Sequence, residues 1–435
     1  MSNAEFGLIT LQLSLLLAMA HLLGYFFTQM KQPRVIGEIL AGVLLGPSVL
    51  EHVAPRMAAS IFPQMVQGHA SSNQVVLGFI YNLGLLLLMF VSGAETKGLF
   101  QREDRKQIAW LTCVGTAVPF VIAMVAVPWM PLEKLMGEAQ ARTSAVLVIG
   151  IAVAVTSIPV ISKIFFDLGI LKTRFARLVL GVAVLEDVAL WAVLAIATAL
   201  AASGAIPQLK IVQHVAATIA YLVIGLFLAP ALLKRLSASR WNALASASPV
   251  GYAVVVLLAY AAIADAMNVS LVFAAFLAGF AMSADERMGA AIEPIKSFSF
   301  AVFVPIYFAV VGYRLDLSKD FSLVMLATFM GIACLLKLVA AGAGARLAGF
   351  GWLSSMNLAV ATNARGGPGI VLASVAFDAH IINAKFYTTL VLVAVFTSQA
   401  AGYWLGYVLR KGWPLVEDPG NVVAIPVQGE GRIAA

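Results

Sequence analysis

The chain is divided into about thirteen apolar runs, most of them near the length that an α-helix needs to cross a bilayer, about 20 residues. Backbone groups in lipid must be hydrogen-bonded within their own segment, so such runs fold as helices. Of the 435 residues, 61% are hydrophobic and 11% charged, a composition outside the range of soluble domains. We therefore predict an all-α polytopic membrane protein. Its expected helices are 7–28, 33–50, 74–96, 107–130, 143–166, 175–201, 211–235, 249–266, 269–283, 298–313, 321–344, 353–378 and 385–409.

The basic residues predict the orientation of these helices. Most of the 28 lysines and arginines lie in loops after odd-numbered segments or at the C-terminal end, and cytoplasmic loops carry the excess of positive charge. The N-terminus is therefore expected outside and the C-terminus inside. The net charge of +7 is then a topology signal, and no nucleic-acid partner is expected. Residues 1–410 form the predicted transmembrane domain, and residues 411–435 a short disordered cytoplasmic tail.

No pattern in the sequence indicates a cofactor. Cys113 and Cys334 both lie in apolar runs, and the five histidines are scattered without a metal-ligand spacing. The glycine-rich run at 341–345 lacks the preceding strand that a nucleotide-binding loop requires. We expect neither a bound cofactor nor enzymatic activity.

Two adjacent acids, Glu186 and Asp187, lie in the middle of the apolar segment 175–201. A charge at mid-bilayer costs about 2.5–3.5 kcal/mol, so the acids are expected to be functional, and ion handling is the expected function. Lys337 lies within the segment 321–344, and we expect it to pair with one acid. Consecutive residues on a helix project about 100° apart, so one acid can face Lys337 while the other faces an ion cavity.

Two of the apolar segments contain helix breakers near their middles. Interrupted helices at corresponding positions of two halves indicate the binding site of a secondary transporter. The two segments are the fifth and the twelfth, and this odd offset means that they cross the membrane in opposite directions. We predict an inverted repeat with two crossed discontinuous helices, although an ordinary proline kink stays an alternative for the fifth segment alone. The breakers are Pro159 in the fifth segment and Gly366, Gly367 and Pro368 in the twelfth.

Polar residues beside these breaks extend the candidate site. Thr156 and Ser157 can offer hydroxyl groups to freed backbone carbonyls, and Asn363 places an amide at the same depth. Arg365 can interact with the end of a half-helix or with an acid, or serve only to hold the fold. Glu38, in the second segment, can line an access path or help helices to pack.

Several of these runs together resemble the membrane domain of the monovalent cation:proton antiporter superfamily. The similarity is greatest to its second branch, which holds bacterial sodium/proton exchangers and Kef-type potassium-efflux proteins, and it covers nearly the whole chain. The runs are VIGEILAGVLLGPSVL at 35–50, NLGLLLLMFVSGAET at 82–96, VTSIPVISKIFFDLGILKTRFARLVLGVAVLEDV at 155–188, FLAGFAMS at 276–283, FVPIYFAVVGYRLDL at 303–317 and NARGGPGIVLASVAFD at 363–378.

The resemblance implies roles for individual residues. Asp187 matches the aspartate that binds the transported cation and the proton, Glu186 the position before it, and Lys337 the core lysine. Thr156, Ser157 and Asn363 match positions at the crossing of the broken helices. The usual first acid is aspartate, so Glu186 departs from the pattern by one methylene.

The resemblance also implies an assembly and a motion. It implies a homodimer in a bacterial inner membrane, in which a core slides against a dimerisation domain in an elevator-like movement. The core helices lie within 107–201 and 321–409, and the dimerisation helices within 7–96 and 211–313.

These observations predict a secondary-active Na⁺/H⁺ antiporter, with K⁺ and Li⁺ as further candidate cations, in which cation and protons compete for Asp187. The acids and Lys337 allow more than one proton per cation, so transport is expected to be electrogenic. Three alternatives stay open: a K⁺/H⁺ antiporter or K⁺ efflux protein of the same fold, an organic-anion symporter, and a sensor or channel-like subunit. Potassium-efflux relatives are similar in having glutamine at position 186, so the acid here favours sodium.

Overall fold

The computed structural model describes residues 2–30, 32–62, 72–95, 104–202, 208–267 and 269–416. Within these ranges ten helical segments are long and apolar enough to cross a membrane. The three other predicted segments contain shorter helices: two of them are broken in the middle, and the third is the short helix Leu271–Met282. The predicted helical membrane architecture is confirmed, whereas the inside–outside orientation stays a prediction.

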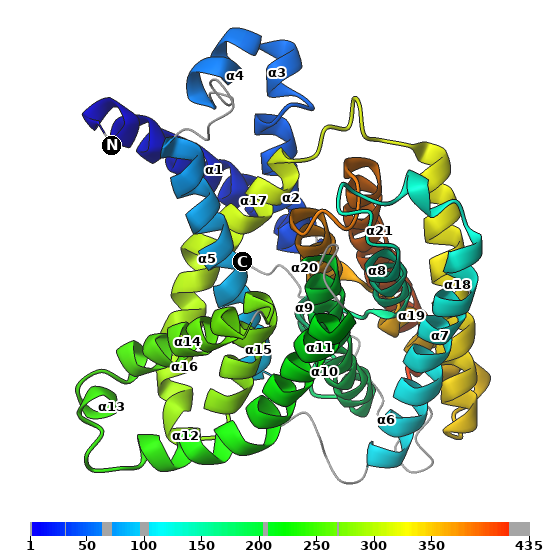
Figure 1. The fold of residues 1–435 in the computed structure, drawn as a ribbon. Coiled ribbons are helices and arrows are strands. Elements are labelled where there is room, and N and C mark those ends of the chain that lie inside the picture. The colour runs from blue at the N-terminus through cyan, green and yellow to red at the C-terminus, as the bar shows by residue number, and fades with distance from the viewer. Residues whose placement is uncertain are drawn as a thin grey trace, which may run out of the picture.

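The first half of the chain supplies seven of the expected segments (Figure 1). Short helices α3 (Leu50–Val53) and α4 (Pro55–Ile61) follow the second segment, and α13 (Ala243–Ala247) follows the seventh. The longer elements are α1 (Asn3–Gln29), α2 (Arg34–Leu45), α5 (Ser72–Glu95), α6 (Arg105–Thr112), α7 (Val118–Ala126), α8 (Arg142–Ala154), α9 (Ile158–Asp167), α10 (Arg174–Ala202), α11 (Gln208–Val223) and α12 (Ala229–Ser237).

The second half supplies the remaining six segments. The division between the eighth and ninth segments is confirmed, because α14 ends at Ala266 and α15 begins at Leu271. The elements are α14 (Pro249–Ala266), α15 (Leu271–Met282), α16 (Gly289–Phe298), α17 (Val304–Tyr313), α18 (Leu323–Leu347), α19 (Trp352–Thr362), α20 (Gly366–Asp378) and α21 (Ala384–Arg410).

Within the described ranges, three of the membrane-spanning segments contain a π-helical turn, which was not predicted from the sequence. The turns are η2 (Cys113–Ala117), η5 (Ile224–Leu228) and η7 (Ser299–Phe303). Each turn ends two residues before a proline, namely Pro119, Pro230 and Pro305. A proline inside a helix lacks the N–H donor, and its ring clashes with the carbonyl four residues earlier. The wider π turn accommodates the proline without ending the helix.

Glycines let two pairs of helices approach closely. A Cβ atom on Gly42 of α2 would lie 1.8 Å from the carbonyl oxygen of Ala309 in α17, and one on Gly312 of α17 would lie 1.9 Å from that of Ile39. Gly93 of α5 and Gly279 of α15 make the same kind of reciprocal contact. In lipid the hydrophobic effect does not drive helices together. Small residues such as glycine let the helices approach closely, and the resulting van der Waals packing stabilises the contact. These contacts bring α2, α5, α15 and α17 together as one group.

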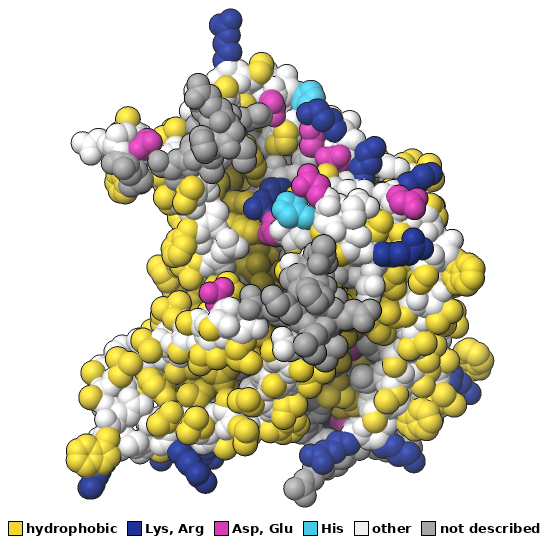
Figure 2. All heavy atoms as spheres, viewed as in Figure 1, with side chains coloured by type: hydrophobic (Ala, Val, Ile, Leu, Met, Phe, Trp, Pro, Cys, Tyr) yellow, Lys and Arg dark blue, Asp and Glu magenta, His cyan; other side chains and the backbone are white. Residues whose placement is uncertain are grey.

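The remaining central helices form a second group, in which α18 packs on α19 and on η2, α20 on α21, and α8 on α7 and α10. Hydrophobic side chains cover much of the visible surface, while Lys and Arg side chains lie mainly toward its upper and lower ends (Figure 2). This distribution suits a protein surrounded by a bilayer. The two groups correspond to the predicted dimerisation and core helices, although that division of roles stays a prediction.

The first residues of the predicted tail are ordered. The side-chain amide of Asn357 in α19 donates to the carbonyl oxygen of Leu415 at 3.1 Å, and Leu415 is buried. The indole N–H of Trp404 donates to Asn357 Oδ1 at 3.0 Å. Residues 411–416 therefore pack against the helices, and residues 417–435 of the predicted tail lie outside the described residues.

Candidate functional site

The first helix break separates α8 from α9 at residues 155–157. Ser157 has an extended backbone and caps α9, its Oγ accepting from the N–H of Val160 at 3.3 Å. Pro159 lies in the first turn of α9, where its missing N–H removes no helical hydrogen bond. The break therefore precedes Pro159, whereas the sequence predicted a break at the proline itself.

The second break separates α19 from α20 at residues 363–365. Gly366 follows it with a φ of +38°, in the left-handed region that favours glycine. A Cβ atom at this position would lie 2.4 Å from Val160 Cγ2 and 2.6 Å from Ser157 Oγ. Gly367 and Pro368 lie in the first turn of α20, so here too the predicted breakers follow the break itself.

The two breaks contact each other directly. The N–H of Ser157 donates to the carbonyl oxygen of Ala364 at 2.7 Å, and the hydroxyl of Thr156 donates to the carbonyl oxygen of Thr362. Helix α21 supports the crossing, because Ser398 Oγ accepts from the N–H of Gly366 at 3.1 Å. The predicted crossing of two discontinuous helices is therefore present, and it is fully buried.

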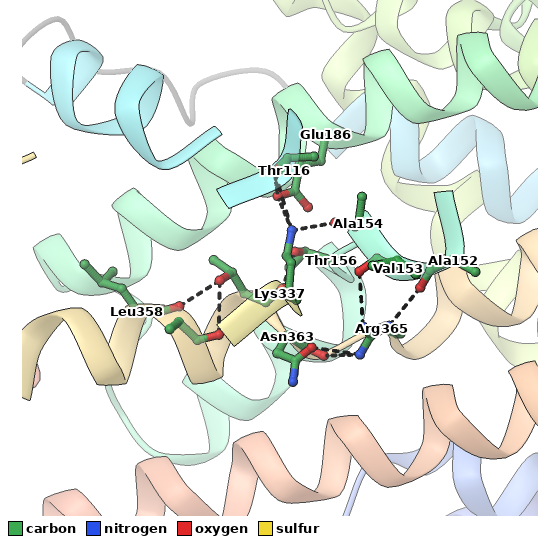
Figure 3. Close-up of polar contacts among 12 residues, drawn as sticks. Thr116, Ala152, Val153, Ala154, Thr156, Glu186, Lys337, Leu358, Asn363 and Arg365 are labelled. Atoms are coloured by element: carbon green, nitrogen blue, oxygen red, sulfur yellow. Dashed lines mark hydrogen bonds and ion pairs between the residues drawn. The ribbon is translucent and has the colours of Figure 1, made fainter. Parts of the chain in front are cut away.

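Lys337 of α18 forms a buried ion pair with Glu186 of α10 (Figure 3). The distance from Lys337 Nζ to Glu186 Oε1 is 2.8 Å, and both side chains are 0% exposed. Lys337 Nζ also donates to the carbonyl oxygen of Ala154 at 2.5 Å and lies 3.4 Å from Thr116 Oγ1. The hydroxyl of Thr116 donates to Glu186 Oε1 as well. The expected pairing of Lys337 is confirmed, with Glu186 as its acid.

Asp187 differs from its neighbour because nothing described in the structure pairs with it. The residue is 0% exposed, and neither carboxylate oxygen has a hydrogen-bond partner among the described residues. Its helix, α10, packs against α8, α9 and α19, three of the four elements that flank the two breaks. A buried carboxylate without a partner is costly unless it binds a proton or a cation.

Arg365 holds the end of α8. Its Nε donates to the carbonyl oxygen of Ala152 at 2.9 Å, and its Nη2 to that of Val153 at 3.1 Å. Lys337 bonds the next carbonyl, that of Ala154. The last carbonyls of a helix have no partner within it and carry its negative dipole end, so two cations stabilise this half-helix. Of the roles considered for Arg365, the contact with a half-helix end is the one observed.

Some of the residues expected to bind the cation already take part in hydrogen bonds within the protein. Asn363 Oδ1 accepts from Arg365 Nη1 at 2.8 Å, the hydroxyl of Thr156 holds the crossing, and Ser157 Oγ caps α9. Thr116, which lies on the π turn η2, was not predicted from the sequence. The proline two residues after that turn, Pro119, is the only local signal that could have indicated it.

A cavity of about 230 Å³ lies between the two groups of helices. Glu38 of α2 lies in its wall and pairs with Arg34, with 2.9 Å between Arg34 Nε and Glu38 Oε1. Of the two roles considered for Glu38, this position favours lining a path between the helix groups. Asp187 is not among the lining residues, which are Pro33, Arg34, Val35, Glu38, Leu88, Met89, Ser92, Val160, Phe300, Val304, Phe308, Gly367, Pro368 and Val371.

The chain is similar to known cation/proton antiporters. The family model described as "Sodium/hydrogen exchanger, transmembrane" matches residues 15–411. The chain is 30% identical over 408 residues to K⁺/H⁺ antiporter 1 of Saccharomyces cerevisiae, covering 91% of this chain and 45% of that protein. It is 25% identical over 400 residues to the Na⁺/H⁺-K⁺ antiporter GerN of Bacillus cereus, covering 91% and 95%.

The likeness extends to a solved structure. The sodium proton antiporter MjNhaP1 from Methanocaldococcus jannaschii superposes with a TM-score of 0.63 at 15% identity, covering 94% of this chain and 99% of that one. The two proteins therefore share a fold. The chain spans about half the length of several curated relatives that it matches, including the yeast protein.

Proposed function

Because the chain belongs to the sodium/hydrogen exchanger family, we propose that it is a secondary-active antiporter that exchanges a monovalent cation for protons. One observation carries this proposal. Asp187 is a fully buried carboxylate with no hydrogen-bond partner among the described residues, whereas the adjacent Glu186 is paired with Lys337. One acid is therefore available to a mobile positive charge while its neighbour is already neutralised.

In this proposal a proton and a cation occupy Asp187 alternately. Asp187 is fully buried, so its negative charge is weakly screened, and the carboxylate is favoured when it binds either a proton or a cation. Thr156 uses its hydroxyl hydrogen on the carbonyl of Thr362, which leaves lone pairs on the oxygen that can accept a cation. Apart from the reversible O–H bond of the protonated carboxyl group, exchange of this kind makes or breaks no covalent bond, so no enzymatic step is involved.

The proposed cation is Na⁺, and K⁺ is the second candidate. The acid at position 186 favours sodium within the resemblance described above. The yeast relative, however, is named a K⁺/H⁺ antiporter, and GerN a Na⁺/H⁺-K⁺ antiporter. These names support antiport of monovalent cations. Na⁺ and K⁺ stay the two candidate substrates.

Access to the site is proposed to alternate by movement of one helix group against the other. The cavity supports this idea, because its walls come from α2, α5 and α17 on one side and from α9 and α20 on the other. We further propose that the protein is a homodimer in a bacterial inner membrane. Exposed apolar side chains on α1, such as Leu22 and Tyr25, offer a surface for either lipid or a second copy.

The test is ion flux in proteoliposomes that contain the full chain. A pH gradient is imposed, and Na⁺, K⁺, Li⁺ or choline chloride is added outside. We expect Na⁺ to dissipate the gradient with saturable kinetics, while choline leaves it intact. Dissipation by K⁺ alone would replace sodium with potassium in the proposal. If none of the three metal cations moved protons, the antiporter assignment would be rejected, and organic anions would be tested next.

A further inference from the structure

We propose that Thr116 is a positioning residue for exchange: it holds Glu186 against Lys337, so that Asp187 is the acid left to receive the cation. The inference rests on the proposed function and adds to it a residue outside every motif that carries the family resemblance. It also assigns a purpose to the π turn η2, which places this hydroxyl in the core.

The hydroxyl of Thr116 can satisfy both charged partners at once. It donates its hydrogen to Glu186 Oε1, and its oxygen lies 3.4 Å from Lys337 Nζ, which donates to it. Thr116 is 6% exposed and the two charged residues are still more buried. The three side chains come from three elements, η2, α10 and α18, and converge at one point (Figure 3).

The local sequence explains how the hydroxyl reaches this point. Pro119 favours the π turn, and Gly115 on that turn lets α18 approach. A Cβ atom on Gly115 would lie 3.0 Å from the Cα atom of Ala341. Ala341 follows Lys337 by four residues and therefore lies on the same face of α18. The contact between Gly115 and Ala341 thus sets the depth at which Lys337 meets Thr116.

Positioning matters because two acids are adjacent on α10. Lys337 and Thr116 both engage Glu186 Oε1, while Glu186 Oε2 has no hydrogen-bond partner among the described residues. Without the hydroxyl, a single ammonium group would hold a long side chain, and the negative charge of Glu186 would lose one of its two stabilising partners. A proton would then neutralise Glu186 more easily. The positive charge of Lys337, no longer balanced by Glu186, would repel the cation.

Three variants test the inference in proteoliposomes: Thr116→Val, Thr116→Ser and Thr112→Val. Thr112 lies one turn earlier, and its hydroxyl has no hydrogen-bond partner among the described residues, so Thr112→Val controls for the loss of a threonine hydroxyl in this segment. KM and maximal rate for Na⁺ are measured at several pH values. We expect Thr116→Val to raise KM at least threefold at the acidic end, with a smaller effect at alkaline pH and a maximal rate within twofold of wild type.

The serine variant and the control are expected to stay within twofold of wild type throughout. A Thr116→Val protein with unchanged KM and pH profile, beside an active wild type, would overturn the inference and leave the proposed function standing. A lower maximal rate with unchanged KM, shared by Thr112→Val, would reduce Thr116 to a structural residue.

A second measurement keeps the inference testable if the wild type shows no exchange, which would reject the proposed function. Thermal unfolding is compared for Thr116→Val, Glu186→Gln and the double variant. If Thr116 holds Glu186, the two losses of stability are coupled, since both changes remove the same contact. Additive losses would overturn the positioning role whatever the transport assay shows.

Discussion

Arg314 and Asp378 form an ion pair, with 2.6 Å between Arg314 Nη1 and Asp378 Oδ1, that joins the end of α17 to the end of α20. Tyr81 of α5 reinforces it, since its hydroxyl donates to Asp378 Oδ2 at 3.0 Å and its ring centroid lies 4.3 Å from the guanidinium carbon. The cavity touches α20 at its other end, at Gly367 and Pro368. The two helix groups are therefore separated by a cavity at one end of α20 and bridged at the other.

The first prediction concerns this bridge. Because both side chains are about a third exposed, we expect Arg314→Gln and Asp378→Asn to be coupled by about 0.5–1 kcal/mol in a double-mutant cycle of unfolding free energy. The pair Lys319–Asp316 in the neighbouring loop is the control, because Lys319 is 77% exposed and its coupling should be smaller. Equal coupling in both pairs would show that the bridge contributes no more than a surface contact.

The second prediction is that Asp187→Asn abolishes exchange without loss of folding. The change keeps the size of the side chain and removes the charge for which proton and cation compete. Asp265→Asn, an exposed acid on α14, is the control and should transport normally. Cation-driven proton movement by a correctly inserted Asp187→Asn protein would refute the role assigned to this carboxylate.

The third prediction concerns the buried ion pair. Lys337→Ala leaves Glu186 charged and without its counter-charge, and breaking a buried pair costs about 3–5 kcal/mol, so thermal stability should fall. Adding Glu186→Gln removes the stranded charge and should recover part of that loss. If the losses simply added in the double variant, the contact between the two side chains would be contradicted.

The fourth prediction uses two adjacent glycines. Gly366→Ala would bring a methyl group within 2.6 Å of Ser157 Oγ and into a left-handed backbone conformation, so it should destabilise the crossing by about 1–3 kcal/mol. In Gly367→Ala the new Cβ atom would meet its nearest neighbour, Phe308 Cζ, at 3.9 Å, so it should be tolerated. Thermal unfolding of the two variants measures the difference, and similar melting temperatures would argue against a tight crossing at Gly366.

The helices and the two broken segments could be predicted because hydropathy and helix breakers act locally along the chain. The partner of Lys337 could be predicted only as an acid, since the rotation of α10 decides whether Glu186 or Asp187 faces it. The breaks lie just before the predicted residues, because prolines are tolerated in the first turn of a helix. The pairing of Arg314 with Asp378 had no sequence signal, since it joins segment ends that are brought together only by the fold.

The fifth prediction is that exchange responds to membrane potential. If the Glu186–Lys337 pair exchanges a proton in addition to the one on Asp187, more than one proton moves per cation and the cycle carries net charge. Uptake is measured in vesicles clamped at zero and at negative potential, and we expect both rate and end point to differ. Glu186→Asn should lose this response, because the acid of the pair is gone. Indifference of the wild type to voltage would show that Glu186 stays ionised throughout the cycle.

Four of the buried charges, those of Glu186, Asp187, Lys337 and Arg365, decide what the electric field can act upon at the site. With all four ionised, the two acids and two bases cancel. A sodium ion on Asp187 leaves a single net positive charge, and so does a proton on the same carboxylate. Both loaded forms would then carry the same charge through the membrane, and the field would favour neither direction. Only a change in the protonation of the Glu186–Lys337 pair makes the charge carried across the membrane differ between the two directions of the cycle.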